Sequence, residues 1–414
     1  MDIQNSELYG FLINGLKKNV PPADFAANLA ALSPERWQDF LELAARQRVT
    51  SLLWHHLKQK NLDKVVPEAA SASLHDAYRR NTMNNLLFNG ELRLLLSALQ
   101  TENIPLIMLK GIMLANAVYE NIGLREMNDI DVLAQPEHLN KIADILIGMG
   151  YSPLQPFCTN VAMQTRHHLP RFIKKGYAAF EIHWNLTNPD KHYHINAHGL
   201  WERAVPIQIA SYQTLTLSHE DMLLHICLHT SYLHPFTFGL RPFCDIAETI
   251  NHFSSTLDWQ TVADRAISQK WQRGVYLVLR LAVELTGASV PDDIMRKLQP
   301  PDVSDLILET ARTQIFTDKY FANTTMSAPF AQLLESRRFS DKIKIFRQRV
   351  FLPKAEIANR YSVPIRSLRI YGCYLHRFFN IIFHNIRTFK NFKKNDLCVK
   401  NLVQRIKLLD DWMD

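Results

Sequence analysis

The sequence predicts an α+β protein that is predominantly helical, with a small mixed β-sheet between helical N-terminal and C-terminal regions. Only 13 of the 414 residues are glycine, which favours a helix-rich architecture. Apolar residues recur with helical spacing in the first and last parts of the chain, whereas short extended runs alternate with helices in between. The chain is longer than one compact core needs, and we divide it into residues 1–83, 84–217, 218–335 and 336–414.

The first region is predicted to be helical throughout. Ser33 followed by Pro34 is typical of a helix start, and the apolar spacing continues from there through residue 44. A second helix is expected from Ser51 to Lys58. Residues 84–102 give one more helical pattern, which leads into the extended segments of the second region.

A strand, a tight turn and a helix are predicted at the start of the second region. The apolar run from Ile104 to Leu109 is broken by Lys110 and Gly111, and apolar residues resume with helical spacing at Ile112. A helix that begins just after a glycine presents free backbone N–H groups and the positive end of its dipole. This arrangement suits a phosphate group.

Three acidic residues follow on predicted strands. Asp129 and Asp131 are two apart, so on a strand they project from one face, where their mutual repulsion makes a divalent cation the natural partner. Glu181 lies in residues 178–186, AAFEIHWNL, which alternate as a half-buried strand does. Three carboxylates from two strands beside a phosphate-binding turn are suited to two magnesium ions.

The other elements of the second region complete a small sheet. Residues 136–151 are expected to form a helix that ends at a glycine, and residues 168–186 a hairpin that turns at 174–176. Residues 207–217 are interpreted as a last strand or an extended arm. Ser218 has the character of an N-cap, and the pattern after it is helical again.

The order of these motifs resembles the DNA polymerase β superfamily of nucleotidyltransferases. More narrowly, LKG, VYEN, LREMNDIDVL, GMGY and FEIHWNL resemble the uncharacterised bacterial nucleotidyltransferase family of type 5. The likeness is densest from Pro105 to Leu186 and continues more weakly through LLHICLHTSYLH, GLRPFCDIAETI and FLPKAEIANRYS. The chain departs from the superfamily pattern at Ile112, where Gly or Ser is usual, and in the long gap before Asp129.

The resemblance implies a nucleotidyltransferase core over residues 84–217. It implies that Asp129 and Asp131 ligate the metals and that Glu181 completes the site and accepts the proton of the acceptor hydroxyl. The expected cofactor is Mg²⁺, with Mn²⁺ as a substitute, and the expected substrate is an NTP such as ATP.

The nucleotide-binding residues expected from the resemblance are Lys110, Gly111 and Arg125. Gly111 would let the backbone approach the phosphates, and either cation would neutralise charge on the transferred phosphoryl group. Structural alternatives remain open: Lys110 as a solvated charge, Arg125 as a partner of Glu120 or Glu126, and Glu181 as a surface acid on an edge strand. The structural alternative for Asp129 and Asp131 is a pair of strand-end acids without metal.

Three further residues are candidates for positioning or for substrate contact. His183 shares a strand face with Glu181, and it either orients that carboxylate, touches substrate or is a half-buried histidine. Arg241 and Asp245 are four apart in RPFCDIAETI and are expected to form a helical ion pair. The resemblance suggests that their helix packs near the cleft.

Three histidines, His225, His229 and His234, suggest a zinc site at first inspection. The first two are four apart on one helix, a spacing that zinc sites use. However, no Glu follows His225 directly and no third ligand is indicated. We interpret these histidines as structural or as substrate-facing.

Positive charge is concentrated near the C-terminus. Residues 337–400 contain sixteen Lys or Arg and three Asp or Glu, so this stretch is strongly basic and the rest of the chain is net acidic. Ten aromatic residues from Phe346 to Phe392 are interleaved with these charges. Such a tail can bind nucleic acid, lie on an anionic membrane surface, or cover the protein core with its charged face in water.

Cysteine use and hydropathy predict a cytoplasmic protein. The five cysteines form no CxxC pair and are odd in number, which suits a reducing compartment. The N-terminal segment MDIQNSELYG has no basic, apolar leader, and no apolar run reaches the length of a membrane span.

The predicted reaction is transfer of a nucleoside monophosphate from an NTP to an acceptor hydroxyl or phosphate, with release of pyrophosphate. The acceptor is a small molecule, a peptide product or RNA; an RNA acceptor would require the basic tail and would bind in a salt-dependent manner. Two other hypotheses remain. One is a catalytically silent binding protein with the same fold, and the other is a toxin-like enzyme that modifies RNA or protein.

Overall fold

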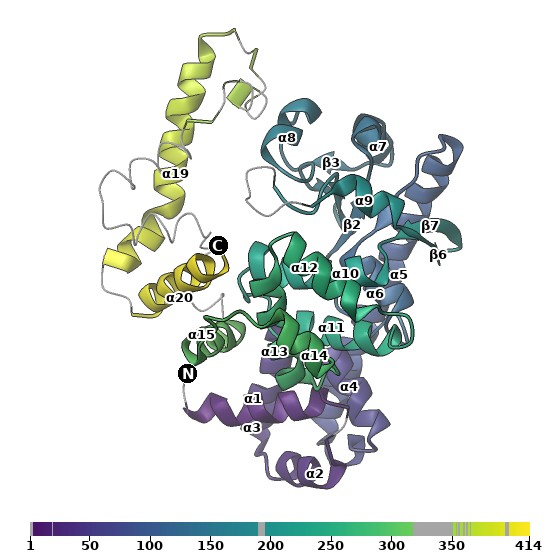
Figure 1. The fold of residues 1–414 in the computed structure, drawn as a ribbon, viewed down its shortest axis with the longest axis vertical. Coiled ribbons are helices and arrows are strands. Elements are labelled where there is room, and N and C mark those ends of the chain that lie inside the picture. Colours follow the sequence, from purple (N-terminus) through teal and green to yellow (C-terminus); the bar gives the residue numbers. More distant parts are fainter. Residues whose placement is uncertain are drawn as a thin grey trace.

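The computed structural model describes residues 3–317, except 19 and 189–194, and residues 351–414, except 353, 355, 356, 359, 360, 362, 365 and 394–396. It confirms a predominantly helical α+β fold with one seven-stranded mixed sheet (Figure 1). The sheet and its covering helices lie at one end of the main body, and the N-terminal helices lie at the other.

The N-terminal helices form as the sequence predicts. They are α1 (Ile3–Leu16), α2 (Pro22–Ala30), α3 (Pro34–Arg46) and α4 (Thr50–Gln59), followed by a 3₁₀ turn at Asp63–Val65. The Ser33 side chain caps α3 by accepting a hydrogen bond from the Arg36 N–H at 3.3 Å. Helices α1 and α3 pack together, and α4 packs on both α1 and α5. This packing buries Leu12, Phe40 and Leu53 completely.

The long helix α5 (Glu68–Thr101) links the N-terminal helices to the sheet. The helix predicted at residues 84–102 is only its second half, and α5 runs across the division proposed between residues 83 and 84. No proline interrupts these 34 residues, so nothing in the backbone ends the helix earlier.

The sheet has the strand order β3-β4-β5-β2-β1-β7-β6. Its two central strands, β2 (Asp129–Leu133) and β5 (Ala179–His183), are parallel and aligned over their full length. Strand β1 (Ile107–Met108) pairs antiparallel with β2 and parallel with β7 (Tyr212–Thr216). Because β2 is buried from Ile130 onward, its side chains are held firmly in place.

The predicted strand, turn and helix around Gly111 are confirmed. Helix α6 (Lys110–Ala117) begins one residue earlier than expected, so that Gly111 lies in its first turn. The sharp change of direction falls on Lys110 itself, whose φ is 39°. A lysine in this left-handed region is strained.

Both edges of the sheet end in hairpins. The predicted hairpin is formed by β4 (Phe172–Ile173) and β5, and β3 (Ser152–Pro153) adds antiparallel to β4. At the other edge the segment 207–217 is not one strand but belongs to a hairpin of β6 (Val205–Ile209) and β7. The turn between them uses positive φ angles at Ala210 and Ser211, residues that give little turn signal in the sequence.

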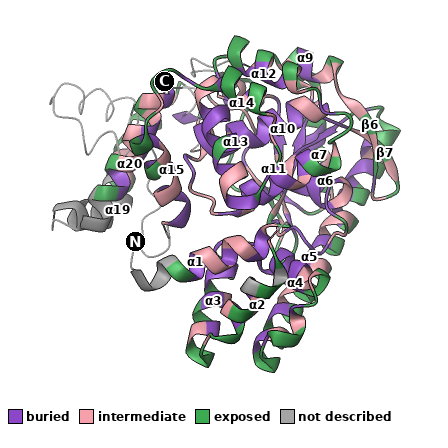
Figure 2. Ribbon diagram, turned by 60° about the horizontal axis from the view of Figure 1, so that its bottom comes forward, coloured by how far each residue is buried: buried purple, intermediate pink, exposed green. Residues whose placement is uncertain are grey.

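Helices surround the sheet and continue into a second helical layer. The predicted helix at 136–151 is a 3₁₀ turn (Pro136–His138) followed by α7 (Leu139–Gly148). Two further short helices are α8 (Thr159–Thr165) and α9 (Ala197–Glu202). The second layer comprises α10 (His219–Leu228), a π-helical turn (His229–Leu233), α11 (Arg241–His252), α12 (Trp259–Ser268), α13 (Gln272–Thr286) and α14 (Asp292–Leu298). Figure 2 shows that α10, α11 and α13 are the most buried of these.

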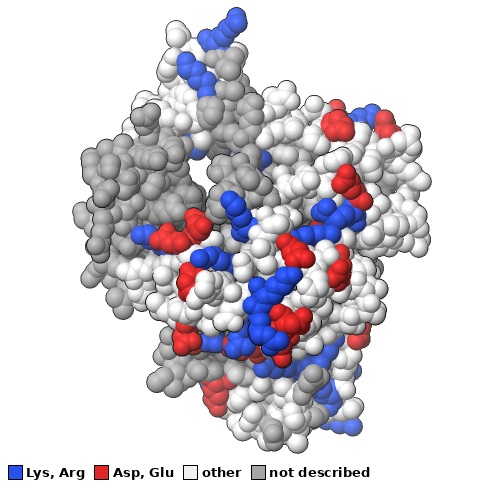
Figure 3. All heavy atoms as spheres, in the orientation of Figure 1, with Lys and Arg blue, Asp and Glu red and all other residues white. Residues whose placement is uncertain are grey.

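The described C-terminal elements are α15 (Asp305–Phe316), α19 (Arg369–Lys393) and α20 (Leu397–Met413). Helix α20 packs against α15, with Leu409 and Met413 joining the main core. Residues 336–350 of the predicted basic tail lie outside the described residues. On the face shown in Figure 3, the described Lys and Arg are interspersed with Asp and Glu. Among the described residues, no helix has both the length and the apolar character needed to cross a bilayer.

His56 makes the packing of the N-terminal helices sensitive to pH. Its Nδ1 lies 3.2 Å from the Gly15 carbonyl oxygen, and burial between α1 and α4 lowers its pKa to about 4. The unfolded chain therefore takes up a proton near pH 6.5, whereas the folded chain resists protonation. Between pH 6.5 and pH 4 the free energy of unfolding should fall by about 3 kcal/mol more in the wild type than in His56→Gln. Urea denaturation at several pH values measures this difference, and parallel pH profiles would contradict it.

Candidate active site

The site is built on the parallel pairing of β2 with β5. The register places Asp131 beside Glu181 and Leu133 beside His183. As a result, ligand atoms of Asp131, Glu181 and His183 all lie within 4.8 Å of one another. Oxygen donors of this kind suit Mg²⁺, and the additional imidazole nitrogen also suits Mn²⁺. The three residues are therefore able to hold a metal ion.

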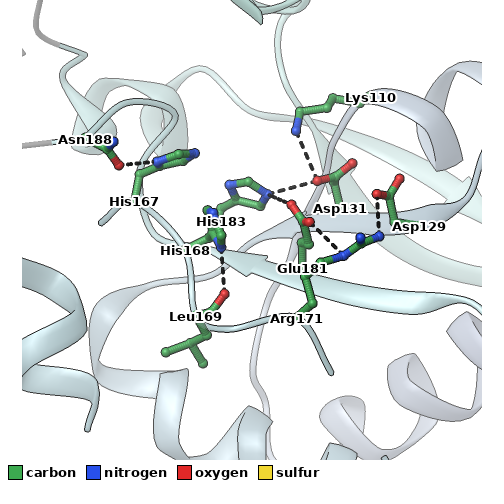
Figure 4. A network of polar contacts seen from close by, with 10 residues as sticks. All are labelled: Lys110, Asp129, Asp131, His167, His168, Leu169, Arg171, Glu181, His183 and Asn188. Carbon is green, nitrogen blue, oxygen red and sulfur yellow. Dashed lines mark hydrogen bonds and ion pairs between the residues drawn. The ribbon is translucent and has the colours of Figure 1, made fainter. Parts of the chain in front are cut away.

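Asp131 is the centre of this group. Its Oδ1 is 3.0 Å from Lys110 Nζ and 2.9 Å from His183 Nε2 (Figure 4). The His183 ring lies 3.6 Å from the Glu181 carboxylate and so links the two acids. Asp131 and His183 are buried, whereas Glu181 is partly exposed to the adjoining cavity.

Arg171, which comes just before β4, bridges the other two carboxylates. Its Nη2 donates to Asp129 Oδ2 at 2.9 Å, and its Nε lies 3.0 Å from Glu181 Oε1. Asp129 points toward Arg171 and is not one of the three residues within 4.8 Å of one another. All three predicted acids thus converge, but Asp129 is linked to Glu181 through a cation.

The acids differ in their tendency to ionise. Burial, together with the charges of Asp131 and Glu181, raises the pKa of Asp129. Burial would also raise the pKa of Asp131, but Lys110 and His183 outweigh it and hold this pKa well below its usual range. The pKa of Glu181 is lowered in the same way, since the hydrogen bond and charge of His183 overcome its burial. Asp131 and Glu181 are therefore carboxylates at neutral pH.

Two further histidines surround His183. The ring of His183 is 5.4 Å from that of His167 and 5.2 Å from that of His168. Their outer nitrogens are held by Asn188 Oδ1 and the Leu169 carbonyl oxygen, each at 2.6 Å. Burial lowers the pKa of His167 to about 3, so this ring is neutral at physiological pH. The cluster fixes the position of His183 against Asp131.

A cavity of about 320 Å³ opens beside the acids. Its walls come from both helical regions as well as from the sheet. The lining includes the acids Asp129, Asp131, Glu181 and Asp245, the cations Arg48, Lys110, Arg125, Arg171 and Arg241, and the rings of His229, His234 and Phe238. The cavity therefore combines possible metal ligands with five cationic side chains.

The predicted ion pair between Arg241 and Asp245 is wrong. Both oxygens of Asp245 instead accept hydrogen bonds from Arg125, from Nε and Nη2, each at 2.9 Å. Tyr119 also donates to Asp245 at 2.8 Å, and all three groups are buried. Arg125 lies shortly before β2 and binds both oxygens of Asp245 at once. Such a bidentate interaction is stronger than a single ion pair along one helix. Arg241 donates to the Glu126 carbonyl oxygen at 3.1 Å.

Arg125 is also the structural reason for glycine at position 111. A Cβ at this position would lie 2.5 Å from Arg125 Nη1 and 3.2 Å from Met127 Cβ. Of the alternative partners suggested for Arg125, Glu120 pairs with His55, whereas Glu126 contacts Arg125 through its backbone oxygen, which lies 3.5 Å from Arg125 Nη1. Gly111 thus allows the helix to pack on a buried guanidinium.

The histidines of the second helical layer do not form a zinc site. Within the described residues, the one set of three or more convergent metal ligands is that around Asp131, so His225 and His229 have no third ligand. His229 and His234 line the cavity, and the His229 ring stacks on Phe238 with a centroid distance of 5.4 Å. These rings face the space where a substrate would lie.

Arg48, Arg171 and the histidine pair 167–168 were not identified from the sequence. None lies in a motif with recognisable spacing, and Arg48 is far from the acids along the chain. The HH dipeptide at the start of the predicted hairpin was the only local signal. Their contribution depends on how the helical regions fold back onto the sheet.

The buried pair of Arg125 and Asp245 should be essential for stability. Asp245→Ala leaves the Arg125 guanidinium without its carboxylate and should lower the free energy of unfolding by about 3 kcal/mol. Tyr119→Phe removes one hydrogen bond from the same carboxylate and should cost about 1 kcal/mol. Chemical denaturation of both variants tests this order; an Asp245→Ala protein as stable as wild type would show that water replaces the ion pair.

Comparison with known proteins identifies a family for this chain. A family model described as "Uncharacterised nucleotidyltransferase" matches residues 33–287, a range that contains every residue of the cavity. Comparisons with curated proteins and with solved structures gave no match. The match extends over more than half of the chain and supports nucleotidyltransferase activity. The chain therefore belongs to this family of uncharacterised nucleotidyltransferases.

Proposed function

We propose that this protein transfers a nucleoside monophosphate from an NTP to an acceptor hydroxyl or phosphate by a two-metal mechanism. The observation that carries the proposal is the convergence of Asp131 and Glu181 from adjacent parallel strands. Asp129 is linked to Glu181 through the side chain of Arg171, which contacts both carboxylates. The new bond joins the acceptor oxygen to the α-phosphorus, and the bond from that phosphorus to the β-phosphate oxygen breaks. The products are the nucleotidylated acceptor and pyrophosphate.

The carboxylates would hold the divalent ions. Bound there, the ions supply Lewis acidity to the α-phosphate and lower the pKa of the attacking hydroxyl. Asp131 and Glu181 are ionised at neutral pH and offer oxygen ligands, with His183 orienting both. Lys110 neutralises Asp131, and Arg171 neutralises Glu181 and Asp129. For a metal ion to bind, these two cations would have to move away from the carboxylates.

The same cations then have a second role. Lys110 lies at the start of α6 and faces the cavity, so that its ammonium can exchange Asp131 for a phosphate oxygen. Glu181 is the group that accepts the proton of the acceptor hydroxyl, because it is ionised and partly open to the cavity. Arg125 stays with Asp245 and maintains the shape of the site.

Label transfer from NTPs tests the proposal directly. The protein is incubated with α-labelled NTPs, Mg²⁺ and a cell extract that supplies acceptors. Asp129→Asn, Asp131→Asn and Glu181→Gln should each lower the transfer rate by at least about 100-fold, because each removes a charge that stabilises the transition state. EDTA should abolish transfer and added Mg²⁺ should restore it.

A matched control is available in Asp144→Asn, which neutralises an exposed carboxylate on α7. This variant should transfer label at the wild-type rate. Undiminished transfer by both Asp129→Asn and Asp131→Asn would falsify the proposed site.

A catalytically silent nucleotide-binding protein is the second candidate. The ion pairs of Lys110 and Arg171 with all three acids favour it, because they satisfy the carboxylates without metal. Calorimetric titration with a non-hydrolysable NTP separates the two functions. A silent protein binds the nucleotide equally well in EDTA and in Mg²⁺, whereas the enzyme needs the metal.

A further inference from the structure

Five basic side chains line the cavity, and three of them have carboxylate partners. Lys110 pairs with Asp131, Arg171 with Asp129 and Glu181, and Arg125 with Asp245. The other two are Arg48 and Arg241. In the part of the chain that the structure describes, neither has a carboxylate oxygen within 4.0 Å. The five cations of the cavity therefore outnumber its four carboxylates by one, and neither Arg48 nor Arg241 has an ion-pair partner among the described residues.

Arg241 is held with unused hydrogen-bonding capacity. Its Nη1 donates to the Glu126 carbonyl oxygen at 3.1 Å, but its Nε is buried without a hydrogen-bond partner. Burial, together with the nearby charge of Arg125, lowers the pKa of Arg241 to about 10. The guanidinium remains charged at neutral pH, and an anion in the cavity would satisfy both its charge and its free donor.

Arg48 is held in a strained backbone conformation. It follows α3 with φ of 57°, in the left-handed region where a glycine is usual at a helix end. With the Asn128 amide oxygen turned toward it, Arg48 donates through both terminal nitrogens at 2.8 and 2.9 Å. Asn128 precedes Asp129, so this contact aims the guanidinium at the edge of the acidic cluster. Strain of this kind is often kept where a side chain has a function.

The two arginines come from regions far apart in the sequence that are tied together beside the cavity. Gln47 Oε1 accepts a hydrogen bond from the Leu240 N–H at 2.8 Å, which joins the turn after α3 to the start of α11. Burial raises the pKa of Glu126, and the charges of Arg241 and Arg48 both act against this rise. The Glu126 carboxylate is itself held by the backbone of Thr50 and Ser51. Arg48 and Arg241 therefore lie close to the same acid without being paired to it.

We propose that Arg48 and Arg241 form a subsite that binds the β- and γ-phosphates of the NTP, and hence the pyrophosphate product. This inference rests on the proposed nucleotidyl transfer, and it replaces Arg125, which the sequence had suggested for phosphate binding. Two guanidinium groups match the several oxygens of a diphosphate, and each can bind two oxygens at once. The carboxylates of Asp129, Asp131 and Glu181 are left to hold a metal ion, which would in turn bind the α-phosphate.

Binding measurements on Arg48→Gly and Arg241→Gln test the subsite. Each variant should bind Mg²⁺–pyrophosphate and a non-hydrolysable NTP at least about 10-fold more weakly, since each loses a charge-assisted contact. Affinity for the corresponding NMP should change less than about 2-fold, because an NMP lacks these phosphates. Glycine relieves the backbone strain at position 48, so the melting temperature of Arg48→Gly should not fall. An unchanged melting temperature shows that the weaker binding is not caused by misfolding.

The chain offers a close control in Lys270. Like Arg48, it is a cation that follows a Gln C-cap, has a positive φ of 62°, and donates its N–H to the carbonyl three residues back. Its side chain is exposed and does not line the cavity. Lys270→Gly should therefore leave pyrophosphate and NTP affinity unchanged, and equal losses in Lys270→Gly and Arg48→Gly would overturn the subsite.

The outcomes separate this subsite from the proposed reaction. If the wild type transfers label but both arginine variants keep their NTP and pyrophosphate affinity, the subsite is wrong and the reaction stands. If the arginine variants lose that affinity while the wild type transfers no label, the subsite stands and the protein is a silent binder. A loss confined to the rate with a phosphorylated acceptor, at unchanged NTP affinity, would assign the arginines to the acceptor and overturn the subsite.

Discussion

The parallel pairing of β2 with β5 is the constraint on which the candidate site depends. A shift of one residue would turn Glu181 to the other face of the sheet and separate it from Asp131. The register is held because Ile130 and Val132 on β2 and Phe180 and Ile182 on β5 are completely buried. The hydrophobic core thus determines the distance between the acids.

The negative charges of the three acids are balanced by cations that contact them. Three acids within one cluster repel one another, and Lys110, Arg171 and His183 compensate this repulsion. Arg125 and Asp245 neutralise each other in a buried pair that also borders the cavity. Each acid of the cavity thus has at least one cationic partner.

The helical regions contribute directly to the cavity. The turn between α3 and α4 reaches α11 through the hydrogen bond from Leu240 to Gln47, and it carries Arg48 to a cavity otherwise formed by the sheet and the second helical layer. The family match begins at residue 33, so it includes this turn together with the sheet. The N-terminal region thus contributes a side chain to the cavity in addition to supporting it.

The sequence by itself determined the fold class, the helix starts at Ser33 and Ser218, and the candidate acids, because capping, alternation and the spacing of Asp129 and Asp131 are local properties. Only the tertiary structure decided three features of the site. These are the ion pair of Arg125 with Asp245, the contacts of Arg171 with Asp129 and Glu181, and the position of Arg48 in the cavity wall. Each joins residues from separate elements, and an ion pair depends on distance in space. Local spacing suggested that Asp245 pairs with Arg241 along one helix, but Arg125, from another element, donates to both oxygens of this carboxylate.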